Sequence, residues 1–129
     1  MMGSESTWRL AMRILVNLPA GFFTRLELKP IFDRLHQMGQ IRCTSYDTPE
    51  QIAEDLCWAQ AVIMWSWPTL SEQMLDRAKD LQYLGQIDVD CPTAKAAMER
   101  GIAMSLSKGG WSPAVAELAL GLMLSCLRK

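Results

Sequence analysis

The chain has few of the residues that ligate metals or exchange protons near neutral pH, and no motif that organises them. It contains 1 histidine, His36, and 4 cysteines in 129 residues. The cysteines form no C-x-x-C pair, which excludes a zinc finger and a thioredoxin-type dithiol; they are Cys43, Cys57, Cys91 and Cys126. We therefore expect free thiols, buried or semi-buried, of the kind kept reduced in a cytoplasmic protein, and no bound metal.

Neither an excess of one charge nor a long apolar run is present. Lys and Arg number 13, Asp and Glu 14, and the net charge is −1, so the sequence predicts no nucleic-acid partner. Apolar runs are too short to cross a membrane. Residues 1–11 lack the apolar core of a signal peptide, and we expect a disordered leader there. Because hydrophobic residues make up 50% of the chain, it should fold as one domain.

The glycine-rich phosphate loops of nucleotide-binding proteins are also missing. No G-x-G-x-x-G occurs, and Gly109-Gly110 is a doublet that predicts only a flexible turn. The first strand runs into Asn17-Leu18-Pro19-Ala20-Gly21, without the hydroxyls of a flavin-phosphate loop. The third strand ends at Met64-Trp65-Ser66, where a phosphorelay receiver needs a carboxylate. We therefore expect this chain alone to bind no dinucleotide cofactor.

What the sequence does contain is a regular alternation of strands and helices. Five apolar segments are expected as strands: 12–18, 41–46, 61–65, 81–87 and 102–106. Helices are expected from Pro30 to Gly39, from Thr48 to Ala59, from Thr69 to Lys79 and from Pro92 to Arg100. The alternation predicts an α/β fold over residues 12–108, a doubly wound, flavodoxin-like sheet of five parallel strands with helices on both faces.

Local signals at the ends of these elements support the same pattern. Thr48 with Gln51, and Thr69 with Glu72, each have the spacing of a capping box at a helix start. Gly101 follows the fourth helix in the position that favours a left-handed backbone. The segment Ala61–Trp65 has no polar residue, which is typical of a parallel strand covered on both faces.

The last segment, Pro113–Leu127, is predicted to be an extra helix that is apolar nearly all round. Between Ala114 and Leu127 only Glu117 and Ser125 are polar. A single packed face cannot bury such a helix, so it needs partners on several sides. We expect residues 109–129 to form an interdomain or dimerisation helix and the chain to form a homodimer through it.

In a doubly wound sheet, ligands bind at the carboxyl ends of the strands. The segments that follow the predicted strands are Asn17–Ala20, Tyr46–Asp47, Ser66–Pro68, Gln86–Asp90 and Ser107–Trp111. His36 lies within a predicted helix, far from these ends, which favours a surface position over a catalytic one. Two interpretations are open for Asp88 and Asp90. They could form a metal or loop site, or they could cap the helix after Pro92, and the capping role is favoured.

Two motifs together resemble the D-isomer-specific 2-hydroxyacid dehydrogenases. The first is Leu81-Gln82-Tyr83-Leu84-Gly85, followed by Asp90, Ala96-Ala97 and Arg100-Gly101-Ile102. The second is the string V-A-E-L-A-L-G-L-M-L at 115–124, similar to the family's helix that crosses into its nucleotide domain. The resemblance covers about residues 12–129.

The resemblance implies a two-domain enzyme in which a flavodoxin-like substrate domain is joined to a domain that binds NAD or NADP. Hydride passes between the nicotinamide and C2 of a 2-hydroxy or 2-oxo acid. The family's arginine, histidine and carboxylate, like its dinucleotide loop, match no residue here. The chain therefore corresponds to the substrate-binding portion, with the NAD-binding domain missing, and has no assigned catalytic residue.

The resemblance also points to a substrate-binding loop after the fourth strand, whose backbone N–H groups meet the substrate carboxylate. The matching positions are Gly85, Gln86, Ile87 and Asp88. The loop is shorter than in the family and carries Gln86 and Asp88 where the family has glycine. The segment Ser66–Pro68, including Trp67, is expected to line the same cleft.

Two functions remain open at this point. One is the N-terminal, substrate-binding part of a cytoplasmic NAD(P)-dependent oxidoreductase acting on 2-hydroxy or 2-oxo acids, inactive alone. The other is a stand-alone, non-catalytic α/β module for binding or dimerisation.

Overall fold

The computed structural model describes residues 12–87, 93–107 and 112–128. The expectations for the leader at 1–11, for Asp88 and Asp90, for Cys91 and for the turn at Gly109-Gly110 therefore fall outside the described residues.

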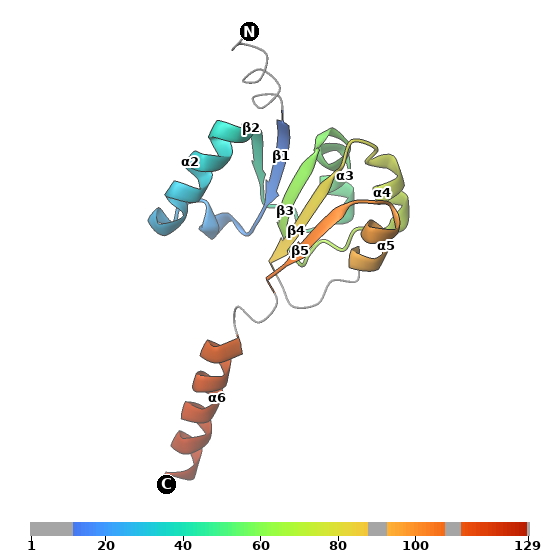
Figure 1. Ribbon diagram of the computed structural model, residues 1–129. Helices are drawn as coiled ribbons and strands as arrows, with labels where there is room; N and C mark the ends of the chain where they lie inside the picture. Colours follow the sequence, from blue (N-terminus) through green and yellow to red (C-terminus); the bar gives the residue numbers. More distant parts are fainter. Residues whose placement is uncertain (1–11, 88–92, 108–111, 129) are drawn as a thin grey trace.

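The predicted alternation of strands and helices is confirmed, and Figure 1 shows the sheet at the centre of the fold. The strands are β1 (Met12–Asn17), β2 (Gly39–Thr44), β3 (Ala61–Trp65), β4 (Tyr83–Ile87) and β5 (Ala103–Leu106). The helices are η1 (Ala20–Phe22), η2 (Leu26–Leu28), α2 (Lys29–Met38), α3 (Pro49–Trp58), α4 (Glu72–Arg77), α5 (Thr93–Glu99) and α6 (Ser112–Leu127). All strand pairs are parallel in the order β2-β1-β3-β4-β5, the flavodoxin-like topology that the sequence predicts.

One face of the sheet is sealed by α3, α4 and α5, which lie together on one side in Figure 1. Alternate strand residues point into this layer, because side chains along a strand alternate between faces. Leu15, Val62 and Leu84, from three neighbouring strands, are 0% exposed there. The helices contribute Ile52 and Leu56, also 0% exposed. This layer is the main hydrophobic core.

The opposite face is covered less completely, and we call it the open face. Among the described residues, only α2, with the 3-10 turns before it, packs there, over a second apolar cluster built on Ile14, Val16 and Leu18. Ala61, Ile63 and Trp65 of β3 pack against this cluster and are half-buried. The strand is therefore covered on both faces, fully on one and partly on the other.

Capping residues and glycines in the sequence predicted most helix ends correctly. The capping box of Thr48 and Gln51 is present at the start of α3. Gly101 follows α5 with a φ of 73°, a left-handed conformation that glycine adopts without strain. The start predicted for α4 is wrong: Ser71, not Thr69, is the cap, and its hydroxyl accepts a hydrogen bond from the backbone N–H of Met74.

The apolar helix α6 is present as predicted and extends away from the sheet in Figure 1. Every side chain from Ser112 to Leu127 is exposed, and the seven large apolar ones are 57–79% exposed. Within the part of the chain that the structure describes, no helix has the length and apolar character needed to span a membrane.

The three described cysteines are free, as expected, but they are not buried. Cys43, Cys57 and Cys126 are all exposed. Cys57 lies on α3 beside the buried Leu56, which takes the core position, and Cys126 lies on the exposed α6. The prediction of buried thiols is wrong for these three, because each occupies an outward position of its element.

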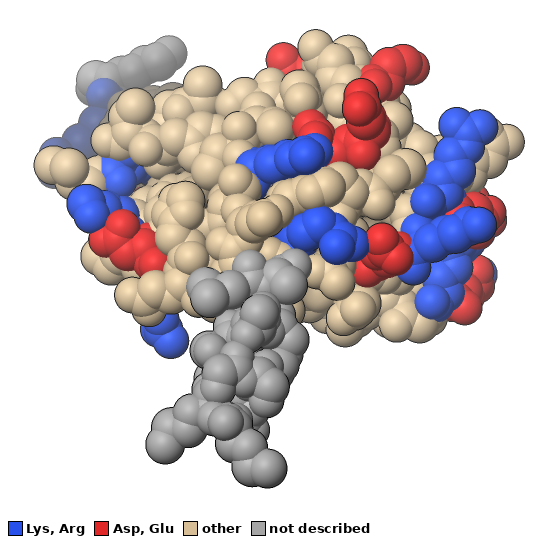
Figure 2. Space-filling model, turned by 90° about the horizontal axis from the view of Figure 1, so that it is seen from above, with Lys and Arg blue, Asp and Glu red and all other residues tan. Residues whose placement is uncertain are grey.

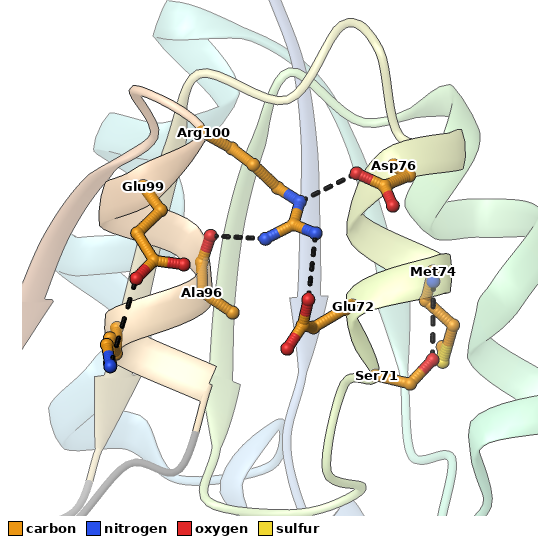
Figure 3. A network of polar contacts seen from close by, with 8 residues as sticks. Ser71, Glu72, Met74, Asp76, Ala96, Glu99 and Arg100 are labelled. Carbon is orange, nitrogen blue, oxygen red and sulfur yellow. Dashed lines mark hydrogen bonds and ion pairs between the residues drawn. The ribbon is translucent and has the colours of Figure 1, made fainter.

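A branched polar contact joins α4 to the end of α5 and is shown in Figure 3. The Arg100 guanidinium donates to Asp76 at 2.7 Å, to Glu72 at 3.3 Å and to the Ala96 carbonyl at 2.9 Å. The hydrogen bond and positive charge of Arg100 lower the pKa of Asp76 below its usual value. The contact holds two neighbouring helices of the sealed face together.

We predict that Arg100 makes the stability of the fold dependent on acid pH. Because the pKa of Asp76 is lower in the folded state, the pair stabilises the fold above the unfolded-state pKa, and this stabilisation is lost as pH falls through the folded-state pKa. Arg100→Gln should therefore lower the urea midpoint at neutral pH and have a smaller effect near pH ~3.

The test is urea unfolding at several pH values, with Lys95→Gln as the control. Lys95 lies on the same helix and pairs with Glu99 at only 4.0 Å, with both side chains exposed. An Arg100→Gln effect that is the same at both pH values would contradict the account.

Candidate functional site

A polar and aromatic pocket of about 310 Å³ lies where β1, β2 and β3 end. It collects residues from three segments far apart in the sequence, because parallel strands end at one edge of the sheet. The lining residues are Asn17, Leu18, Pro19, Ala20, Ser45, Tyr46, Asp47, Trp65 and Trp67. We call this hollow the edge pocket.

Asn17, the last residue of β1, holds the floor of the edge pocket. It is 2% exposed, and its Oδ1 accepts hydrogen bonds from the Tyr46 backbone N–H at 2.7 Å and the Thr44 hydroxyl at 2.8 Å. Its Nδ2 donates to the Tyr46 carbonyl at 3.1 Å. Asn17 thereby fixes the β2–α3 loop against the end of β1.

Tyr46 is fixed from its other end as well. Its phenolic hydroxyl donates to Asp55 on α3 at 2.8 Å, and this hydrogen bond, with the negative charge of Asp55, raises the pKa of Tyr46. Asp55 also accepts from Arg42 of β2 at 2.6 Å, while the Arg42 guanidinium lies over the Trp58 ring. Tyr46 is therefore a structural wall of the pocket rather than a free acid.

Aromatic rings form the other wall of the edge pocket. The ring centroids of Trp65 and Trp67 are 5.4 Å apart, with the rings edge to face. The ring centroid of Phe22 lies 5.3 Å from that of Trp65. Trp67 is 43% exposed and presents its ring to the pocket from the segment after β3. A ring held in this way gives apolar contact area that needs little further ordering when a ligand binds.

Of the cleft residues expected after β3, the structure brings only Trp67 into the edge pocket. Ser66 is half-buried and does not line it. The register pairs Trp65 of β3 with Ile87 of β4, so Ser66–Trp67 and the carboxyl end of β4 lie at the same edge of the sheet.

The residues expected as a loop after the fourth strand occupy a different position. Gly85, Gln86 and Ile87 are the last three residues of β4, inside the sheet, so the loop prediction is wrong for them. Gly85 leaves space for Tyr83, whose hydroxyl bonds that of Ser105 on the open face. Ile87 belongs to the apolar cluster of the open face. Asp88 falls outside the described residues.

Gln86 lies at the carboxyl edge with an unsatisfied polar atom. It is 3% exposed, and its Oε1 has no hydrogen-bond partner in the structure. The hydroxyl of Ser107, just after β5, is buried and unpartnered in the same way, and the Ser107 backbone N–H donates to the Gln86 carbonyl. A buried polar atom without a partner costs free energy, which is typical of sites completed by another group.

The site residues that sequence reasoning did not select come mainly from β1 and from the segment after β2. These are Asn17, Ser45, Tyr46 and Asp47, all in segments that follow strand ends. The signal in the sequence was their position, since ligands bind at the carboxyl ends of the strands in a doubly wound sheet. What the sequence could not show was that their pocket lies nearer β1 and β2 than β4.

Among the described residues that line the edge pocket, Asp47 carries a carboxylate, and no histidine or cysteine lines it. His36 is exposed on α2, as predicted, and is not part of the edge pocket. Among the residues described, no group of three or more His, Cys, Asp or Glu could hold a metal ion. On the face shown in Figure 2, acidic and basic side chains lie interspersed around broad uncharged areas.

Comparisons with known proteins agree with this architecture. No protein-family model matches the chain. It is 28% identical over 96 residues to the D-3-phosphoglycerate dehydrogenase of Methanocaldococcus jannaschii, covering 73% of this chain. The fold resembles the crystal structure of the TT0316 protein of Thermus thermophilus with a TM-score of 0.67 and 25% identity over 88% of this chain. The predicted resemblance to D-2-hydroxyacid dehydrogenases is therefore confirmed.

The chain corresponds to a minor part of each of these proteins. It spans 18% of the length of the dehydrogenase and 36% of the Thermus chain.

We predict that Asn17→Ala destabilises the fold and loosens the edge pocket. The change leaves the Tyr46 backbone groups and the Thr44 hydroxyl without their buried partner, which should cost about 2–3 kcal/mol. The measurement is urea unfolding followed by tryptophan fluorescence, since Trp65 and Trp67 line the same pocket.

Thr24→Ala, which removes one exposed hydroxyl bonded to the Gly21 carbonyl, is the control and should change stability by less than about 0.5 kcal/mol. Equal effects of the two changes would show that Asn17 does not hold the pocket.

Proposed function

We propose that the chain is the N-terminal, substrate-binding portion of an NAD(P)-dependent oxidoreductase that acts on 2-hydroxy or 2-oxo acids, and that it is inactive alone. The observation that carries the proposal is the sequence similarity to a D-3-phosphoglycerate dehydrogenase over 73% of the chain. The edge pocket supports it, because it lies at the sheet edge where doubly wound folds bind ligands.

The proposed substrate lies along the carboxyl edge, between the edge pocket and the end of β4. Trp67 contacts its apolar part from the pocket wall, and Ser66 contacts it from the end of β3, outside the edge pocket. The carboxylate lies at the end of β4, near Gln86. Asp47 lies in the edge pocket, so an anion is better placed toward β4, away from that carboxylate.

The cofactor requires residues that this chain does not supply. Beyond β1 the chain passes into the 3-10 turn η1 rather than into a glycine-rich loop and helix, so the described residues do not fit a dinucleotide. NAD or NADP is therefore proposed to bind to a separate domain of the complete enzyme. No catalytic step is assigned to residues of this chain.

Two partners complete this proposal. One is the NAD-binding domain to which residues 109–129 would lead. The other is a second copy of the chain, contacted through Pro113–Leu127, since these exposed apolar side chains need burial. The proposed location is the cytoplasm.

The alternative function is a stand-alone, non-catalytic module for binding or dimerisation. The exposed surface of α6 favours it, because such a surface fits an association partner as well as an interdomain contact. The two functions differ in whether the edge binds 2-oxo acids.

We predict that the isolated chain binds a simple 2-oxo acid weakly at the carboxyl edge. Titration with pyruvate should shift the indole N–H signal of Trp67 in nuclear magnetic resonance spectra more than that of Trp58. Trp58 is the internal control, because it packs against Arg42 away from the edge pocket.

Propionate, which lacks the 2-oxygen, is the matched control ligand and should give smaller shifts. Trp67→Ala should weaken pyruvate binding severalfold, and Trp67 is exposed enough for the fold to tolerate the change. No response at Trp67, or equal responses to both acids, would favour the non-catalytic module.

We also predict that the chain alone does not convert 2-hydroxy or 2-oxo acids in the presence of NAD or NADP. The reason is that the sequence contains no G-x-G-x-x-G dinucleotide motif. The assay is the absorbance of the reduced nicotinamide. Turnover that rises in proportion to chain concentration and persists through repurification would contradict the assignment.

A further inference from the structure

The edge pocket has a single charged group among its described lining residues, the carboxylate of Asp47. The other polar side chains of the pocket are already engaged. The Ser45 hydroxyl donates to a backbone carbonyl at 2.7 Å, Asn17 bonds the loop after β2, and the Tyr46 hydroxyl donates to Asp55. Within the described part of the chain, the Asp47 carboxylate makes no hydrogen bond or ion pair. It is therefore the polar group that this pocket offers to a ligand.

The start of α3, which follows Asp47, does not account for this charge. Thr48 and Gln51 cap the helix reciprocally, and Glu50 supplies an acid in the first turn. The backbone N–H of Asp47 donates to the Gln51 side chain at 3.1 Å, so the backbone is held while the carboxylate takes no part in the cap. The position of Asp47 is thus fixed without using its charge.

An indole ring lines the same pocket and complements a cation. Trp67 is 43% exposed and lines the edge pocket together with Asp47. Among aromatic side chains, the face of an indole attracts ammonium and guanidinium groups most strongly. No lysine or arginine is among the described lining residues, and Arg25, which lies over the Phe22 ring, lines a different hollow. A carboxylate and an indole in one pocket without a basic residue favour a positively charged ligand group.

We propose that the edge pocket binds the positively charged end of the substrate's side chain, so that the substrate is a 2-hydroxy or 2-oxo acid ending in an ammonium or guanidinium group. Asp47 pairs with this cation, and Trp67 packs against it. The carboxylate at the other end of the substrate lies near Gln86. This specificity rests on the oxidoreductase function proposed above and names the substrate class of the same site.

The spacing of the strands fits a substrate of moderate length. Asp47 follows β2 and Gln86 lies in β4, with β1 and β3 between them, so three strand spacings of roughly 14 Å in all separate the two ends. Six bonds of an extended chain, like two residues of extended backbone, cover about 7 Å, and a polar contact at each end adds about 3 Å. A charged nitrogen six bonds from the carboxylate carbon therefore reaches both ends of the site.

The test compares three 2-hydroxy acids of matched length that differ in the group at the far end. They are 6-amino-2-hydroxyhexanoate, with an ammonium group, 2-hydroxyheptanoate, with a methyl group, and 2-hydroxyheptanedioate, with a carboxylate. Pentylamine probes the cation site without the acid. Each is titrated into the full chain, and the shift of the Trp67 indole N–H signal in nuclear magnetic resonance spectra gives its dissociation constant. Trp58, which packs against Arg42, is the internal reference.

A matched pair of variants isolates the carboxylate. Asp47→Asn removes the charge and keeps the size of the side chain. Its control is Glu50→Gln, which removes an exposed acid of the same helix start that does not line the edge pocket. Both variants change the net charge equally. Because both side chains are exposed, circular dichroism should show both proteins folded.

We expect 6-amino-2-hydroxyhexanoate to bind at least about fivefold more tightly than 2-hydroxyheptanoate, and 2-hydroxyheptanedioate to bind most weakly. The preference for the ammonium group should shrink as salt is raised, because salt screens an ion pair near the surface. Asp47→Asn should abolish this preference and the response to pentylamine, and Glu50→Gln should preserve both.

Equal binding of the three acids would overturn the specificity and leave the oxidoreductase function standing. A preference that survives Asp47→Asn, or that Glu50→Gln reduces equally, would also overturn it. Conversely, binding of pentylamine that depends on Asp47, without binding of any acid, would support the cation site and contradict the oxidoreductase function.

Discussion

The unequal covering of the two faces of the sheet determines most of what this chain can do. Three helices seal one face over Leu15, Val62 and Leu84, all fully buried, and this packing fixes the parallel register of the strands. Since the register is fixed, the strand ends meet at one edge, where the edge pocket forms. Among the described residues, the other face receives only α2 with the 3-10 turns before it, and it keeps apolar hollows.

Much of the fold was predictable because its signals are local. Apolar runs such as Ala61–Trp65 give strands, and the pairing of Thr48 with Gln51 marks a helix start. Gly101 ends α5 as expected, with its left-handed backbone. The apolar character of α6 was also evident, because nearly every residue in it is apolar. These features depend on neighbours within a few positions along the chain.

The features that the sequence did not reveal depend on tertiary contacts. A strand with no polar residue predicts burial on both sides, yet Ile63 and Trp65 are only half-buried, because α2 is the only helix among the described residues that covers this side with the 3-10 turns before it. Gly85–Ile87 were expected both as the end of a strand and, from the resemblance, as a binding loop, and their pairing with β3 decides for the strand. The role of Asn17 was hidden for the same reason, because its partners Thr44 and Tyr46 come from β2 and the loop after it.

We propose that the carboxyl edge of this sheet is a substrate site for small 2-oxo acids. Trp67 and the end of β4 flank that edge, and Gln86 leaves a buried oxygen there without a partner. The most direct measurement is a crystal structure of the chain grown with pyruvate. The account predicts the ligand between Trp67 and the end of β4, with its carboxylate toward β4. Pyruvate bound elsewhere, or none at a concentration that saturates the solution titration, would contradict it.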